Sequence, residues 1–334
     1  MDRRIQNVMS PDRLNEYWDK LATCYFQKRE FLSILHKYNS CEQRYYELYR
    51  NGELVAGTVI YTLRLNLLTF SKLSVPFKMQ VIGLPISVST IPIIGDSSEF
   101  EYFINELLKI EKGLILGLNF SFDFYNGKVV NMRTLPTIVL KKKFQNMEEY
   151  TQSLRYNYRR RLNSIQKKFK NVRSIVTDCS TFTMDHYMLY LQIMGNTTTK
   201  LETLSLELFK NLPQNFILTT HYFNDTMLSW QICCKDNETL YFFFGGMNYQ
   251  LRDAYHSYHN NLISILKESF KSNYQSIDFG QTAERAKISL GGELDERIMF
   301  LYHKNPMILF MLRLFRPIIT YLGKPGPIRV FKAV

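Results

Sequence analysis

The sequence predicts an α/β protein with mixed sheets, in which two similar halves follow one another. Asn51-Gly52 lies between two β-rich runs, which is the strongest short-range signal for a hairpin, and Asn224-Asp225 separates two further runs of the same kind. Helices precede each hairpin and strands with another helix follow it, so the order of elements repeats at an offset of 173 residues, from Asn51 to Asn224. A chain of 334 residues is long enough for two domains. We expect an N-terminal domain over residues 1–147 and a C-terminal domain over 148–334.

The elements of the first half are predicted from the spacing of apolar residues and from the positions of turn residues. Apolar residues at helical intervals after Ser10-Pro11-Asp12 predict one or two helices within 10–37, and the period then changes to that of strands. Pro76, Pro85 and Pro92 separate the extended segments, and Ser97 or Ser98 caps the next helix. The expected elements after the first helices are a hairpin over 44–65, strands over 67–73 and 79–89, a helix over 98–112, and strands over 114–123 and 137–141.

The second half begins with a basic helix over 148–171. The elements expected after it are a strand over 174–177, helices over 184–194 and 201–212, strands over 216–223, 226–234 and 239–244, a helix over 251–272, a strand over 276–279, a helix over 283–290 and a strand over 299–303. Pro213 ends one of these helices, and Gly291-Gly292 ends another. The second half thus repeats the order of the first.

The helix over 148–171 combines an apolar stripe with a basic surface. The stripe has spacings of four, four, three and four residues, typical of a helix that faces a core, and consists of Leu154, Tyr158, Leu162, Ile165 and Phe169. Seven basic residues lie largely outside it, with no acid between the first and the last: Arg155, Arg159, Arg160, Arg161, Lys167, Lys168 and Lys170. This surface is either a binding site for anions or a solvated charged face.

The composition bounds the class of protein and of partner. A hydrophobic content of 46% excludes a disordered chain, and the net charge of +12 favours an anionic partner, namely a phosphorylated cofactor, a nucleic acid, a nucleotide sugar or an anionic lipid surface. The five cysteines show no metal-ligand spacing and indicate reduced thiols in a cytoplasmic protein, and no secretory signal is evident.

The hydrophobic C-terminal segment over 305–334, assigned here to the C-terminal domain, contains the apolar stretch 307–322. Arg313, Arg316 and Pro317 interrupt this stretch, which is too short and too charged to span a bilayer. It is either a buried closing segment or a helix that lies in the plane of a membrane. In the second case the protein would make peripheral contact with the inner face of the membrane.

Four stretches resemble the tandem-GNAT, Fem-like acyltransferases, a family that includes the bacterial peptidoglycan aminoacyltransferases and acyl-CoA-dependent relatives. They are Ser153–Phe169, Tyr255–Thr282, Glu284–Glu293 and Val81–Ser87. The resemblance implies two GNAT-like domains joined by the basic helix, and an N-acyltransferase with acyl-CoA as co-substrate and no metal. The glycine-rich run that binds pyrophosphate in acyl-CoA-dependent GNAT domains is poorly represented, since only Gly245, Gly246 and the later Arg252 occupy its place.

The resemblance also implies the site residues. Lys287, before a glycine pair, corresponds to a lysine at the transfer site, the alternative being an ordinary surface lysine on a short helix. Asp278 is a general base, a group that orients Lys287 or a tyrosine, or a strand-end carboxylate that caps the next helix. Arg159 and Arg155 are expected to clamp a phosphate or carboxylate, and Gly245, Gly246 and Arg252 to contact the donor. The residues expected to contact substrate are Tyr255, Tyr258 and Gln281, although either tyrosine could instead pack in the core.

Three functions remain open at this point. The first is acyl transfer from acyl-CoA to an amine of a cell-envelope precursor or small metabolite. The second is aminoacyl transfer from charged tRNA, which fits the net charge and the weak pyrophosphate run. The third is a non-catalytic tandem-GNAT binding module. His256 and His259 share a helix face but have no third ligand nearby in the sequence, so no metal site is predicted.

Overall fold

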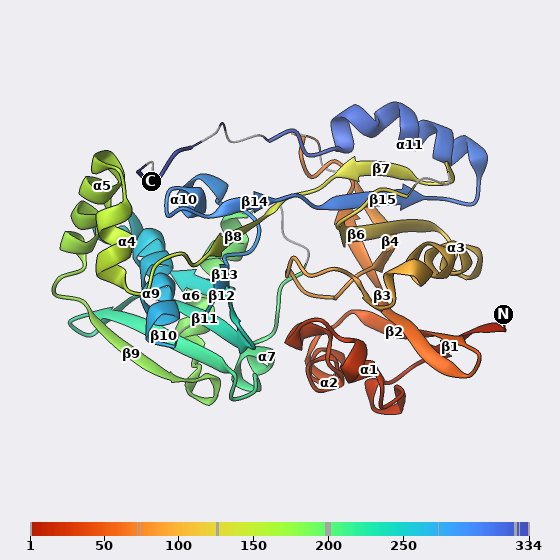
Figure 1. Ribbon diagram of the computed structural model, residues 1–334, viewed down its shortest axis with the longest axis horizontal. Helices are drawn as coiled ribbons and strands as arrows, with labels where there is room; N and C mark the ends of the chain where they lie inside the picture. The colour runs from red at the N-terminus through yellow and green to blue at the C-terminus, as the bar shows by residue number, and fades with distance from the viewer. Residues whose placement is uncertain are drawn as a thin grey trace. The chain divides into compact units, whose positions relative to one another are not determined.

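The computed structural model describes residues 2–71, 73, 75–124, 127–197, 202–272, 274–323, 326 and 328–332, and divides into two compact units (Figure 1). The first unit comprises Met1–Leu135, Thr198–Thr203 and Glu296–Gly323, and the second comprises Pro136–Thr197, Leu204–Asp295 and Lys324–Val334. Each unit contains one mixed sheet, which confirms the predicted α/β class. No helix among the described residues has the length and apolar character needed to cross a bilayer.

This division differs from the predicted domains in two places, the boundary between the units and the C-terminal segment. The first unit ends at Leu135 rather than at residue 147, and the chain returns to it with 296–323, which we had assigned to the C-terminal domain. The return has a clear cause, since the strand β15 (Ile298–Tyr302) pairs with two strands of the first unit. Of the predicted segment 305–334, residues 324, 325, 327, 333 and 334 lie outside the described residues.

The sheet of the first unit has the order β1-β2-β3-β4-β6-β15-β7, with β5 beside β3. Its other strands are β1 (Arg3–Val8), β2 (Glu42–Arg50), β3 (Glu53–Asn66), β4 (Pro76–Ile82), β5 (Ile93–Gly95), β6 (Leu114–Phe120) and β7 (Val130–Arg133). The helices are η1 (Pro11–Arg13), α1 (Trp18–Leu21), η2 (Tyr25–Gln27), α2 (Arg29–Tyr38), η3 (Ser97–Glu99), α3 (Phe100–Ile110) and α11 (Pro306–Ile319). Among the strands that the structure describes in this sheet, β4 and β6 are the one parallel pair, and α3 lies between them in the chain.

The two faces of this sheet carry separate apolar cores. Alternate residues of a strand point to opposite faces, so Ile60 belongs to the core that contains α3, whereas Tyr61 belongs to the core that contains Leu312 and Ile319 of α11. The prediction of a buried closing segment is wrong for most of α11, because eleven of its fourteen residues are exposed.

The sheet of the second unit has the order β14-β8-β13-β12-β11-β10-β9. Its strands are β8 (Thr137–Lys141), β9 (Arg173–Asp178), β10 (Phe216–Phe223), β11 (Thr226–Asp236), β12 (Thr239–Met247), β13 (Ser276–Asp278) and β14 (Glu293–Asp295). The helices are α4 (Met147–Ser153), α5 (Tyr156–Lys168), η4 (Cys179–Thr181), α6 (Met184–Asn196), α7 (Leu206–Lys210), α8 (Arg252–Tyr255), α9 (Ser257–Lys271) and α10 (Glu284–Ile288). Again a helix, α9, separates two parallel neighbours, β12 and β13. The predicted repeat of element order is therefore present.

Both predicted hairpins are present, and their turn residues explain them. Asn51 and Gly52 have φ values of 52° and 88°, and Asn224 has a φ of 50°, a left-handed conformation that asparagine and glycine adopt most readily. Residues 67–71 form a turn instead of the predicted strand, and the strands β1, β5, β7 and β14 were not predicted. Residues 72 and 201, inside predicted elements, lie outside the described part of the chain.

The predicted basic helix over 148–171 is two helices, α4 and α5, both within the second unit. The break is at Leu154, whose extended backbone forms a bridge with Phe331. The backbone N–H of Arg155 donates to Val330 O over 3.0 Å, and that of Lys332 donates to Ser153 O over 2.9 Å. A segment distant in sequence thus takes the hydrogen bonds that a continuous helix would have used, and the structure does not show a single helix between the units.

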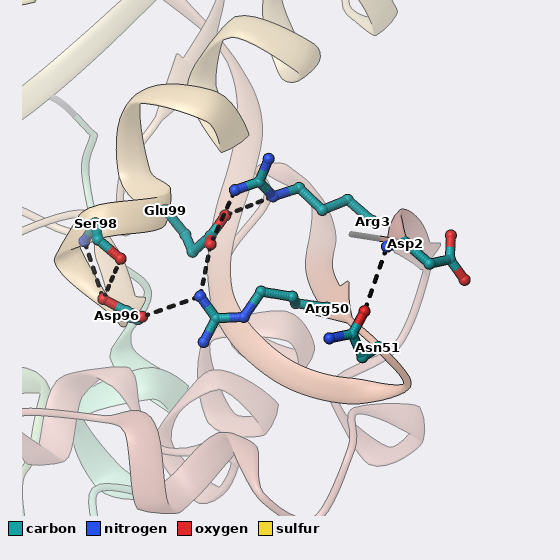
Figure 2. A network of polar contacts seen from close by, with 7 residues as sticks. All are labelled: Asp2, Arg3, Arg50, Asn51, Asp96, Ser98 and Glu99. Atoms are coloured by element: carbon teal, nitrogen blue, oxygen red, sulfur yellow. Dashed lines mark hydrogen bonds and ion pairs between the residues drawn. The ribbon is translucent and has the colours of Figure 1, made fainter.

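The first strand of the chain is held by a buried carboxylate (Figure 2). Glu99, with a side chain 2% exposed, accepts hydrogen bonds from Arg3 Nη2 over 3.2 Å and from Arg50 Nη1 over 2.8 Å, so β1, β2 and the start of α3 converge on one charge. The hydrogen bond from Arg3 and, less strongly, the contact with Arg50 lower the pKa of Glu99 against the opposing effect of desolvation. Arg50 also pairs with Asp96 at 3.5 Å.

We expect Glu99→Gln to lower the free energy of unfolding by about 2 kcal/mol at neutral pH, because two arginines lose their buried anion. Since the pKa of Glu99 is lowered in the folded state, its contribution is full above the unfolded value of about 4.3 and is lost as the pH falls through the folded value. Urea denaturation at neutral and acidic pH measures this, with exposed Glu101→Gln as the control. An equal loss at both pH values would contradict a charge-based role.

Candidate functional site

The predicted residues Asp278, Gln281 and Lys287 come together at the end of β13. This strand lies between β12 and β8, so Asp278 is fixed at its carboxyl end, and a short loop leads from it into α10. Gly280, Thr282 and Ala283 have φ values of 70°, 64° and 47°. Left-handed backbone costs a non-glycine residue of the order of 1 kcal/mol or more, and such strain gathers at functional sites.

Lys287 closes this loop from within. Its residue is 2% exposed, and its Nζ donates to Gly280 O over 3.0 Å and to Gln281 O over 2.6 Å. The Phe242 ring lies 6.0 Å from Nζ. A lysine ammonium has three hydrogen atoms, so two are used by the loop and a third donor remains. The lysine therefore both holds the strained backbone and keeps one N–H for another partner.

The surroundings of Lys287 bring the pKa of its side chain close to neutral pH. Burial lowers its pKa to about 7, against the opposing effects of Asp278 and Glu284. Asp278 Oδ1 accepts from Thr137 Oγ1 over 2.6 Å and from Gly280 N over 2.7 Å, which fixes the carboxylate and the start of the loop together. A group with a pKa near the working pH can both donate and accept a proton, as acyl transfer requires.

The strain in the loop gives a prediction on stability. Ala283→Gly is expected to raise the free energy of unfolding by about 1 kcal/mol, because glycine adopts a φ of 47° without the cost that the alanine Cβ imposes. Ala283 is exposed, so no packing is lost. Thermal unfolding checks this, with Ala254→Gly in α8 as a matched control of opposite sign. A destabilised Ala283→Gly variant would show that the loop is not strained.

The basic surface of α5 belongs to the same unit. Leu162 and Ile165 of the predicted stripe are buried, and Arg155 and Arg160 are exposed, with Arg159 half-buried. Among the residues that the structure describes, these three arginines form no ion pair. Arg161 Nη2 lies 3.2 Å from His259 Nε2 on α9. Positive charges without acidic partners form a surface that attracts anions.

One C-terminal segment contacts both the start of α5 and the turn after α10. Arg155 donates its backbone N–H to Val330 O, and the Phe331 ring packs so closely on Gly291 that a Cβ there would lie 2.3 Å from Phe331 Cζ. Gly291 also has a φ of 91°. The arginine-bearing helix and the turn beyond Lys287 are therefore attached to the same short segment, which the sequence did not indicate.

The predicted donor-binding glycines lie inside β12 and not in a loop. Gly245 and Gly246 pair with Gln231 and Trp230, and a Cβ on Gly246 would lie 2.2 Å from Trp230 Nε1. Packing against this buried indole accounts for Gly246. Arg252 lies in α8, with its Nε 3.1 Å from Asp253 Oδ1. The connection from β12 to α9 is thus a short helix, and a role of these residues in donor binding stays a prediction.

The two predicted tyrosines have packing roles. Tyr255 packs on Phe223 with ring centroids 5.3 Å apart, and Tyr258 packs against the apolar core of the second unit, where burial raises the pKa of its hydroxyl. Their part in substrate binding remains a prediction. Sequence reasoning missed Thr137, which no motif marks and which only the pairing of β8 with β13 brings to Asp278.

A surface cavity of about 500 Å³ lies elsewhere in this unit and includes none of the predicted site residues. It is lined by Ile175, Thr177, Thr181, Thr183, Asp185, His186, Thr220, Tyr222, Asp225 and Met227. Within the described ranges, no group of three or more His, Cys, Asp or Glu side chains is placed to hold a metal ion.

Solved structures share this fold across most of the chain. FemX matches with a TM-score of 0.54 and 11% identity, covering 94% of this chain and 100% of FemX. L-PGS from Bacillus licheniformis matches with a TM-score of 0.52 and 8% identity over 86% of this chain and 92% of its own. A tandem GNAT protein from the clavulanic acid biosynthesis pathway matches with a TM-score of 0.51 and 7% identity, over 91% and 99%.

Sequence comparison adds nothing to these likenesses, because no family model and no curated protein matches the chain. At such low identities a structural likeness shows the fold alone. The two mixed sheets and the repeated order of elements agree with it. The chain therefore has the tandem GNAT fold of the Fem-like kind that its sequence predicted.

Proposed function

We propose that the second unit transfers an acyl group from an anionic carrier to an amine, with Lys287 as the catalytic residue. The observation that supports this most is the geometry of Lys287, a buried lysine with two hydrogen bonds to a strained loop and one N–H to spare. Strained backbone and a lysine pKa lowered to about 7 both occur preferentially at functional sites. The fold agrees with the proposal, since GNAT proteins include acyltransferases.

The reaction needs two proton transfers. The amine nitrogen attacks the carbonyl carbon of an ester or thioester, the bond from this carbon to the leaving oxygen or sulfur breaks, and an amide forms. The third N–H of Lys287 stabilises the oxyanion and gives its proton to the leaving group, while the amine returns a proton to Lys287. Asp278 acts as a positioning residue, because it holds Thr137 and the N–H of Gly280 and favours the charged lysine.

Two observations favour aminoacyl-tRNA as the carrier. Within the described part of the chain, the exposed arginines of α5 form no ion pair, and they offer several contacts to a nucleic acid backbone. The place of the pyrophosphate-binding glycine run is taken by strand β12 and helix α8. Acyl-CoA is the second candidate, because the tandem GNAT fold is consistent with its use.

The acceptor in this proposal is an amine on a cell-envelope precursor or a small metabolite in the cytoplasm. The predicted membrane contact through 307–322 remains part of the proposal, since most of α11 is exposed. A non-catalytic binding module is the alternative, and it would bind the same anions without turnover.

Salt dependence of binding separates the carriers. With about four phosphates neutralised, affinity for tRNA should fall about 100-fold between 50 and 200 mM salt, whereas a single CoA should lose less than about tenfold. Fluorescence anisotropy with labelled aminoacyl-tRNA and isothermal titration with acyl-CoA measure the two slopes. A shallow slope for tRNA together with tight acyl-CoA binding would reverse the order of the candidates. If the protein bound neither carrier, the proposal would be wrong.

A further inference from the structure

Helix α11 exposes an almost wholly apolar surface. Leu309, Leu312 and Ile319 are its apolar contacts with the first unit, on one side of the helix. The opposite face presents Met307 (75% exposed), Phe310 (63%), Met311 (42%), Leu314 (61%) and Ile318 (46%). Spacings of three, one, three and four residues place these five on one stripe, which we call the outer stripe. A helix that is apolar on both sides needs a second apolar environment.

A second segment exposes apolar side chains beside it. Leu73 and Val75, in the turn between β3 and β4, are 61% and 39% exposed, and Phe77, at the start of β4, is 42% exposed. The ring of Phe70 from the same turn lies 5.2 Å from that of Tyr321, just beyond the end of α11. Two segments far apart in sequence are thus in contact in the first unit, and each exposes apolar side chains. Large apolar side chains exposed in groups mark interaction sites, unlike those scattered singly.

The other exposed side of α11 is positively charged. Arg313 and Arg316, three residues apart, lie on the helix side opposite the outer stripe, next to Leu309, and both are exposed, with Arg313 donating to Gly127 O. In the first unit, residues 297–323 contain four lysines and arginines and no acid, and residues 54–95, which include the β3–β4 turn, also contain no acid. Within the described residues Arg316 has no ion pair. Both segments therefore combine exposed apolar side chains with positive charge alone.

We infer that this surface docks on a bilayer that carries anionic phospholipids, with α11 in the plane of the interface. An interfacial helix buries its apolar face about 5–10 Å deep while basic side chains reach the headgroups. The fourteen residues of α11 suit this arrangement, since spanning a bilayer takes about 20. A second copy of this chain is the competing occupant, and sedimentation velocity distinguishes it from a bilayer. The inference does not depend on which acyl carrier the second unit uses.

Sedimentation of the full-length protein with vesicles tests this. We expect binding to vesicles of phosphatidylcholine mixed with phosphatidylglycerol, and at least about tenfold weaker binding to phosphatidylcholine alone, because each arginine near an anionic surface contributes about 1 kcal/mol. Replacing Phe310 and Leu314 with serine should weaken binding to the mixed vesicles about 100-fold. The double change Arg313→Gln and Arg316→Gln should remove the preference for anionic lipid.

Met188→Ser is the matched control, because Met188 is a similarly exposed residue (52%) on α6 of the second unit, and it should bind vesicles as the wild type does. Leu314→Trp gives a second readout, since its fluorescence should shift to the blue with vesicles. Absence of binding to both vesicles by the folded wild type would overturn the inference. So would a wild-type dimer in sedimentation velocity that the Phe310 and Leu314 change converts to monomers, because the surface would then serve self-association.

Discussion

Replacing Lys287 with methionine is expected to lower the rate of acyl transfer about 100- to 1,000-fold, the usual cost of losing a proton donor or an oxyanion partner. Methionine fills a similar volume but supplies no N–H, so the developing charge and the leaving group lose their donor. Steady-state kinetics at saturating carrier measures this. Lys271→Met, on an exposed position of α9, is the control and should leave the rate unchanged.

A pH profile separates this role from a merely structural one. Because burial lowers the pKa of Lys287 to about 7, the protonated fraction falls as the pH rises through this value, and the wild-type rate should fall with it. Lys287→Arg keeps the charge at all these pH values, so its residual activity should lack this descending limb. A Lys287→Met enzyme with the wild-type rate and profile would show that Lys287 only shapes the loop through Gly280 and Gln281.

Reversing two charges on α5, with Arg155→Glu and Arg159→Glu together, should weaken carrier binding roughly 30-fold or more, since each charge-assisted contact to a phosphate contributes about 1 kcal/mol or more. The slope of log affinity against log salt concentration should become shallower, by the amount expected for about one to two fewer neutralised phosphates. Fluorescence anisotropy with aminoacyl-tRNA measures both effects.

The control for this change carries the same net charge. Lys37→Glu with Lys112→Glu alters two exposed lysines of the first unit and should reduce binding only slightly, through the general field of the molecule. Equal losses in the two double variants would mean that net charge, and no particular surface, draws in the carrier.

Elements with local signals were predictable from the sequence, and elements fixed by distant contacts were not. Asn51-Gly52 and Asn224-Asp225 specify their hairpins through φ values that few other residues adopt, so both were found. The break at Leu154 was missed because its hydrogen-bond partners lie at Val330 and Phe331. The place of β15 was missed for the same reason, since its partners β6 and β7 lie in the first half.

The candidate site shows the same division. The resemblance led to Lys287, Asp278 and Gln281, and the structure does place these three together. Nothing local marks Thr282 and Ala283 as left-handed, because neither residue type favours that conformation. The burial of Lys287 also depends on the tertiary structure, in particular on the packing of α10 beside β8 and Phe242.

Transfer by the purified chain tests the central claim most directly. The protein is incubated with a set of aminoacyl-tRNAs or acyl-CoAs and a panel of amines, and the products are identified by mass spectrometry. The proposal predicts a new amide on one amine that forms with the wild type and not with the Lys287→Met variant. No amide with any carrier, or the same amount from both proteins, would contradict it.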